Sequence, residues 1–80
     1  MDDAEIVNRI DQLVAEEHHL EREHSASGLS DGDRARLRDI EVQLDQCWDL
    51  LRQRRARRQA GQDPGSAEER SAEVVEHYQQ

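Results

Sequence analysis

The residues best suited to chemistry in this chain lie in an acidic, histidine-rich stretch from Glu16 to His24. Within it, Glu16 with His19, and Glu21 with His24, have the i, i+3 spacing that supplies metal ligands in di-iron helical bundles. Such a centre also needs carboxylates that project inward from a facing helix, and the inner face of the expected second helix carries leucine and isoleucine instead. We therefore expect a solvated acidic face here, with no bound metal and no cofactor.

A second group of chemically capable residues is a run of five arginines without an acidic residue, Arg52-Gln53-Arg54-Arg55-Ala56-Arg57-Arg58. Arginine suits bidentate contacts with phosphate, but no aromatic residue is interleaved for base stacking. The register described below places acidic residues against this run, namely Asp2, Asp3 and Glu5. We therefore expect the charge to be neutralised within the protein. The alternative is an anion- or nucleic-acid-binding site formed by Arg54, Arg55, Arg57 and Arg58.

Cys47 is the single cysteine, so no disulfide can form within the chain. It lies between two leucines of an apolar stripe and has no obvious base beside it, which predicts a small core residue rather than a nucleophile. Glycine-rich phosphate loops, Ser-His-Asp arrangements and cysteine clusters do not occur in the sequence. We therefore expect a protein that is not an enzyme and that works in a reducing compartment.

Two apolar stripes must position these residues, and they are mirror images about Gly28. The first stripe is Ile6, Ile10, Leu13, Glu17 and Leu20, and the second is Leu37, Ile40, Leu44, Cys47 and Leu51. Each facing pair has residue numbers that add to 57, as Leu13 and Leu44 do. Spacings that alternate between three and four residues are typical of a coiled-coil seam. The stripes therefore predict an all-α, antiparallel two-helix hairpin.

Glu17 is the polar exception in this seam and faces Ile40. An unpaired buried carboxylate is costly, so we expect Glu17 to lean towards Arg36 or Gln43. A polar residue at such a position can fix the register of a seam.

Capping residues give the boundaries of the helices. Asp2 and Glu5 are spaced as a capping box, and Ser30 suits the N-cap of a second helix. Gly28 can end the first helix in a left-handed conformation. We expect a hairpin over residues 1–60 with helices at about 3–26 and 31–60, a linker at 61–66, and a tail or short helix at 67–80.

The hairpin leaves one apolar edge, formed by Val7, Val14 and Trp48, beside the seam. Two arrangements could cover this edge. In one, the C-terminal segment folds over it with Val74, Val75 and Tyr78. In the other, a second hairpin packs on it and completes a four-helix bundle.

The formal charge of −8 argues against general affinity for nucleic acid or anionic membrane. The chain begins without a basic region and has no apolar stretch long enough for a signal peptide or a membrane span. We therefore expect a cytoplasmic protein that binds another copy of itself or another protein. The interpretation from the residues is a non-enzymatic interaction or scaffold module.

The block from Asp45 to Arg58, followed by Ala60-Gly61 and Asp63-Pro64, resembles a family of short actinobacterial proteins, domain of unknown function 2630. The likeness extends to the tail pattern Val75-Glu76-x-Tyr78-x-Gln80. It also extends to these residues early in the chain: Ile10, Leu13, Val14, Glu16, Glu17, His18 and Leu20. It implies a small, helical, intracellular protein and supplies no activity and no functional residue.

Overall fold

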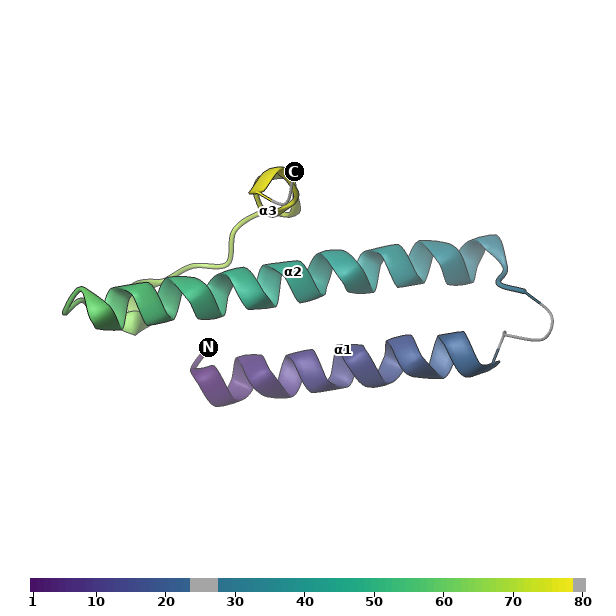
Figure 1. Cartoon of the computed structure of the whole chain (residues 1–80), viewed down its shortest axis with the longest axis horizontal. Helices are drawn as coiled ribbons and strands as arrows, with labels where there is room; N and C mark the ends of the chain where they lie inside the picture. Colours follow the sequence, from purple (N-terminus) through teal and green to yellow (C-terminus); the bar gives the residue numbers. More distant parts are fainter. Residues whose placement is uncertain (24–27, 79–80) are drawn as a thin grey trace.

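The computed structural model describes residues 1–23 and 28–78 of the chain. Within these ranges the elements are α1 (Asp3–Glu23), α2 (Asp31–Gln59), the 3-10 helix η1 (Pro64–Ser66) and α3 (Ala72–Tyr78). The helices α1 and α2 lie side by side and run in opposite directions, and α3 lies on the other side of α2 (Figure 1). The antiparallel all-α hairpin predicted from the two stripes is therefore confirmed.

The helix starts are set by the expected capping residues. The Glu5 N–H donates to Asp2 Oδ1 at 2.8 Å and the Asp2 N–H donates to Glu5 Oε1 at 3.2 Å, which is a reciprocal capping box. At α2, the Asp33 N–H donates to Ser30 Oγ at 3.1 Å. These bonds satisfy donors that have no partner within the helix.

The two helices end near the expected positions. Helix α2 ends at Gln59, and Gly61 follows with φ of +74°, a conformation that costs glycine little. Gly28, in the connection between the helices, has φ of +77°. The last part of the expected first helix, residues 24–26, lies outside the described residues.

The core lies along the seam between α1 and α2. Ile6, Leu13 and Ile40 are at most 1% exposed. Half-buried residues pack against the cluster formed by Ile6, Ile10 and Leu50; they are Val14, Leu44, Cys47, Leu51 and Ala67. Leu50 lies outside both predicted stripes but is 6% exposed, because α2 is covered on more than one side.

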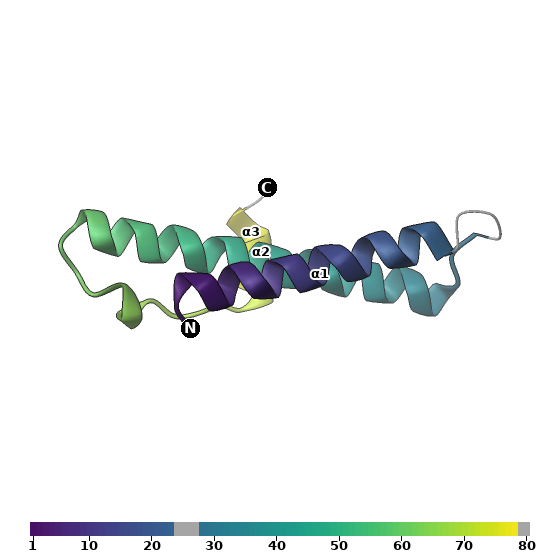
Figure 2. The same ribbon diagram turned by 90° about the horizontal axis from the view of Figure 1, so that it is seen from below.

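The C-terminal segment packs across α2 rather than extending as a tail (Figures 1 and 2). Val75 is 1% exposed. Two amide side chains of α2 bind the backbone that leads into α3: Gln53 Nε2 donates to the Glu68 carbonyl at 2.8 Å and Gln46 Nε2 donates to the Arg70 carbonyl at 3.3 Å. Of the two expected alternatives for this segment, a tail or a short helix, the structure contains the short helix.

No helix of the described chain combines the length and the apolar character needed to cross a membrane.

Truncation of Ile40 tests the seam. Ile40→Ala should lower the free energy of unfolding by about 2–5 kcal/mol, because it opens a cavity at a fully buried position. Urea unfolding followed by circular dichroism measures this change. Arg38→Ala, two residues earlier on the exposed side of α2, is the control and should have little effect. Equal effects of the two substitutions would show that the seam is not the core.

Candidate functional site

The apolar edge predicted beside the seam is open in the structure. Trp48 is 48% exposed and Val7 is 45% exposed. Val14 instead packs partly against the core cluster. Trp48 and Val7 therefore present an exposed apolar pair beside the seam.

The C-terminal segment does not cover this edge, so that alternative is wrong. Gln46, Asp49 and Gln53 of α2 contact the segment, and they lie on a different side of the helix from Trp48. Val75 is buried there, while Val74 stays 42% exposed. The side chain of Tyr78 lies outside the described residues.

Trp48 and the arginine run meet in one groove of about 430 Å³ on this open face. The groove is lined by Asp3, Val7, Trp48, Leu51, Arg52, Arg55 and Arg58. The convergence follows from helical spacing, because residues four and seven positions after Trp48 return to its side of α2. Trp48 and Val7 of the predicted edge therefore share one groove with Arg55 and Arg58 of the predicted anion site. Val14, Arg54 and Arg57 do not line this groove.

Within the arginine run, two members are held by Asp3. Arg54 Nε lies 2.5 Å from Asp3 Oδ1, and Arg58 Nη2 lies 2.8 Å from Asp3 Oδ2. The Arg54 side chain is only 12% exposed, and its Nη1 also donates to the Pro64 carbonyl at 3.2 Å. The hydrogen bonds from Arg54 and then Arg58 hold the pKa of Asp3 below its usual value.

The other arginines of the run are not held in this way. Among the described residues, Arg52, Arg55 and Arg57 make no ion pair and no side-chain hydrogen bond. Asp2 and Glu5 were expected to lie against the run, but they cap α1 instead. Asp3 alone of the three expected acids pairs with an arginine.

The opposite face of the hairpin is closed by a polar network. Arg36 binds Glu16 through two bonds, Nε to Oε2 at 2.5 Å and Nη2 to Oε1 at 2.7 Å. Arg36 also pairs with Asp39 at 2.8 Å, and Asp39 accepts a bond from Gln43, which in turn binds Arg9. The hydrogen bond from Arg36 lowers the pKa of Glu16, and the same bond raises the pKa of Arg36.

This network corrects the expectation for Glu17. No described bond joins Glu17 to Arg36 or Gln43, because those side chains are taken by Glu16 and Arg9. Glu17 is half-buried at the margin of the seam.

The expected metal-ligand spacing does not produce a cluster. The described part of the chain has no group of three His, Cys, Asp or Glu side chains placed to hold a metal ion. Both oxygens of Glu16 bind Arg36, so this carboxylate serves the polar network. His24 lies outside the described residues. The expectation that the protein binds no metal stays a prediction.

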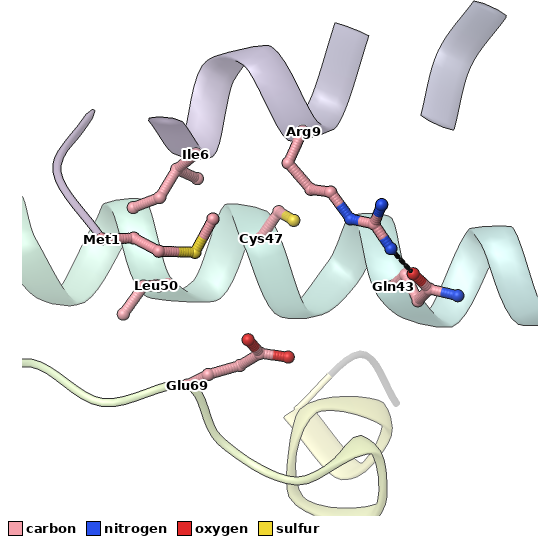
Figure 3. A pocket seen from close by; sticks show the side chains of 7 residues that line it. All are labelled: Met1, Ile6, Arg9, Gln43, Cys47, Leu50 and Glu69. Carbon is pink, nitrogen blue, oxygen red and sulfur yellow. Dashed lines mark hydrogen bonds between the residues drawn. The ribbon is translucent and has the colours of Figure 1, made fainter. Parts of the chain in front are cut away.

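Cys47 lines a small pocket of about 140 Å³ between α1, α2 and the C-terminal segment (Figure 3). The pocket is lined by Met1, Ile6, Arg9, Gln43, Cys47, Leu50 and Glu69. Burial raises the pKa of the Cys47 thiol, and the nearby Glu69 carboxylate adds to the effect. A neutral thiol without a histidine in this pocket is a poor nucleophile.

Asp49 is a structural residue that the sequence reasoning missed. It is 6% exposed, accepts a hydrogen bond from Gln53 Nε2 at 2.9 Å, and lies 3.6 Å from Arg70 Nε. The i, i+4 spacing of Asp49 and Gln53 was a readable signal. Arg70 was not, because nothing in the sequence sets the path of the chain before α3.

Comparison with known proteins places these features in a family. The family described as "Protein of unknown function (DUF2630)" matches residues 2–80. Uncharacterized proteins from Mycobacterium tuberculosis and Mycobacterium bovis are 51% identical over 77 residues, which cover 95% of this chain and 88% of each relative. No solved structure matches the chain significantly.

The ion pairs of Asp3 with Arg54 and Arg58, together called the Asp3 clamp, should make the free energy of unfolding depend on pH. Because the arginines lower the pKa of Asp3 in the folded state, its contribution is complete above the ordinary aspartate pKa of about 4 and is lost as pH falls through the lowered folded pKa. Urea unfolding at a series of acidic pH values should show this loss, and Asp3→Asn should make the dependence shallower. Asp11→Asn, an exposed control, should leave the slope unchanged. An unchanged slope in Asp3→Asn would contradict the clamp.

Proposed function

The chain belongs to the DUF2630 family, and we propose that this member is a non-enzymatic helical interaction module that self-associates through the groove around Trp48. The observation that carries the proposal is the open apolar pair of Trp48 and Val7, on a different side of α2 from the residues that contact the C-terminal segment. Large aromatic side chains dominate the energetics of protein interfaces when a partner buries them.

The small core supports an association of this kind. Hydrophobic residues are 34% of the chain, and six hydrophobic side chains are buried within the described residues. Chains of this size bury too little surface to be comfortably stable alone. Two hairpins joined through the Trp48 face would form a four-helix arrangement and remove that surface from water.

The absence of enzymatic activity is part of the proposal. Burial raises the pKa of the Cys47 thiol, which makes it a weaker nucleophile, and no histidine lines its pocket. His18 and His19 are exposed and make no bond within the described residues. The single cysteine also supports a reducing, cytoplasmic compartment.

A second candidate function is anion binding, favoured by Arg55 and Arg57, which make no ion pair within the described residues. The other two residues of that candidate site, Arg54 and Arg58, are engaged by Asp3. The net charge of −8 repels nucleic acid at long range. This candidate predicts tight, steeply salt-dependent binding of DNA or RNA that is lost in Arg55→Ala.

Sedimentation equilibrium tests the proposal. The weight-average mass should rise from 9.3 kDa towards twice that value as concentration increases, because mass action favours the dimer in which the Trp48 face is buried. Trp48→Ala should stay monomeric at concentrations where the native chain is a dimer. Val74→Ala is the control, since it truncates an apolar side chain on α3 that is 42% exposed, against 48% for Trp48. A native chain that stays monomeric at every concentration would refute self-association.

A further inference from the structure

We propose that two copies of the chain meet about a two-fold axis that passes beside Trp48 and runs across the helices. In this arrangement α2 packs antiparallel on α2 of the partner. The inference rests on the self-association proposed above and adds its orientation and its recognition residues. It is carried by the charges that flank Trp48 on α2.

The charges are arranged almost symmetrically about Trp48 and have opposite signs on its two sides. Glu41 and Asp45 precede it by seven and three positions, while Arg52 and Arg55 follow it by four and seven. These spacings place all five residues along one stripe of the helix. The stripe is therefore acidic at one end, aromatic in the middle and basic at the other end.

All four charged residues of the stripe are without partners in the described chain. None of them makes an ion pair or a side-chain hydrogen bond there. Glu41, Arg52 and Arg55 are exposed, and Asp45 is half-buried. By contrast, Arg36 and Asp39, on the other face of α2, pair with each other.

An antiparallel copy of α2 matches these charges. With Trp48 at the axis, Glu41 lies opposite the partner's Arg55, and Asp45 lies beside the partner's Arg52. The axis repeats both pairs, so the stripe is complementary to itself. Apolar contact of Trp48 and its neighbours in the groove supplies affinity, while the charges select the orientation.

Other dimer axes and other partners would bring like charges together at one end of the stripe. A two-fold axis along the helices would place α2 on the partner's α1. The hairpin register would then bring Arg52 level with the partner's Glu5, but it would bring Asp45 next to the partner's Asp11, so that only the basic end of the stripe would meet opposite charge. An acidic peptide or a nucleic acid would suit the two arginines of the stripe but would meet its two free carboxylates. The second copy across the helices is the arrangement that satisfies both ends of the stripe.

A charge swap tests the orientation. Arg55→Glu alone and Glu41→Arg alone should each weaken dimerisation about tenfold or more, because each creates like-charge contacts across the axis. An equimolar mixture of the two variants should form a heterodimer with near-native affinity. The double variant Glu41→Arg/Arg55→Glu should regain homodimerisation. Arg57→Glu is the matched control: it makes the same change two residues further on, at a residue that lines a pocket with the C-terminal segment, and should leave the dissociation constant near the native value.

Cross-linking gives an independent measure of the axis. In a Cys47→Ala background, Glu41→Cys/Arg55→Cys should be joined between chains by a short thiol cross-linker. Positions 41 and 55 of one α2 are about 21 Å apart, so a short linker cannot join them within a chain. Glu41→Cys alone should not cross-link, because the two copies of position 41 are also about 21 Å apart about this axis.

The outcomes separate this inference from the proposed function. A native chain that never dimerises overturns both. A dimer that is lost in Trp48→Ala but keeps its affinity in Arg55→Glu and Glu41→Arg overturns the orientation and leaves self-association standing. Efficient cross-linking of Glu41→Cys alone does the same. If Arg55→Glu abolishes binding of an anionic partner while Glu41→Arg tightens it, the second copy is not the occupant.

Discussion

The structure depends on α2 serving as the packing surface for every other element. Helix α1 covers one side of it, and η1 and α3 cover another, while α1 and α3 do not contact each other within the described residues. One helix must therefore carry two buried sides and still expose enough charge to stay in water. Asp49 is a charged residue on one of these buried sides. It accepts a hydrogen bond from Gln53 and forms an ion pair with Arg70 of the C-terminal segment, so its carboxylate keeps polar partners where it is shielded from water. Desolvated carboxylates need such partners.

Much of this fold could be predicted because its signals are local or periodic. The mirror relation of the two stripes gives the antiparallel register, and the contact of Arg54 with Asp3 follows it to the end of the hairpin. The burial of Leu50 could not be predicted in the same way. Leu50 packs with Ile6 and Ile10 of α1, and Ala67 of the connection before α3 packs against the same cluster, but the sequence of that short connection does not show where it docks. Short segments of this kind take their position from tertiary contacts rather than from propensity.

The candidate site was predicted in parts rather than as a whole. Trp48 and Val7 were singled out because they lie beside the seam, and Arg55 because it lies in a charged run. That these residues line one groove follows from helical spacing once the contact side of α2 is known. Asp2 and Glu5 cap α1 instead of pairing with the arginines, because a hydrogen bond to a backbone N–H within the same turn forms more easily than an ion pair with a residue distant in the sequence. The sequence pattern thus identified the residues of the site, but which arginines lack an ion pair depends on how the acidic side chains are shared between helix capping and pairing.

The mirror relation about Gly28 also has a consequence for how the chain folds. Seam pairs near the connection, such as Leu20 and Leu37, are close in sequence, whereas Asp3 and Arg54 are separated by 51 positions. The entropy of loop closure grows with separation, so each pair formed shortens the loop that the next pair must close. The hairpin can zip outward from its turn, with the ion pair at its open end forming last. A topology built from such stepwise closures favours rapid folding over a search for distant contacts.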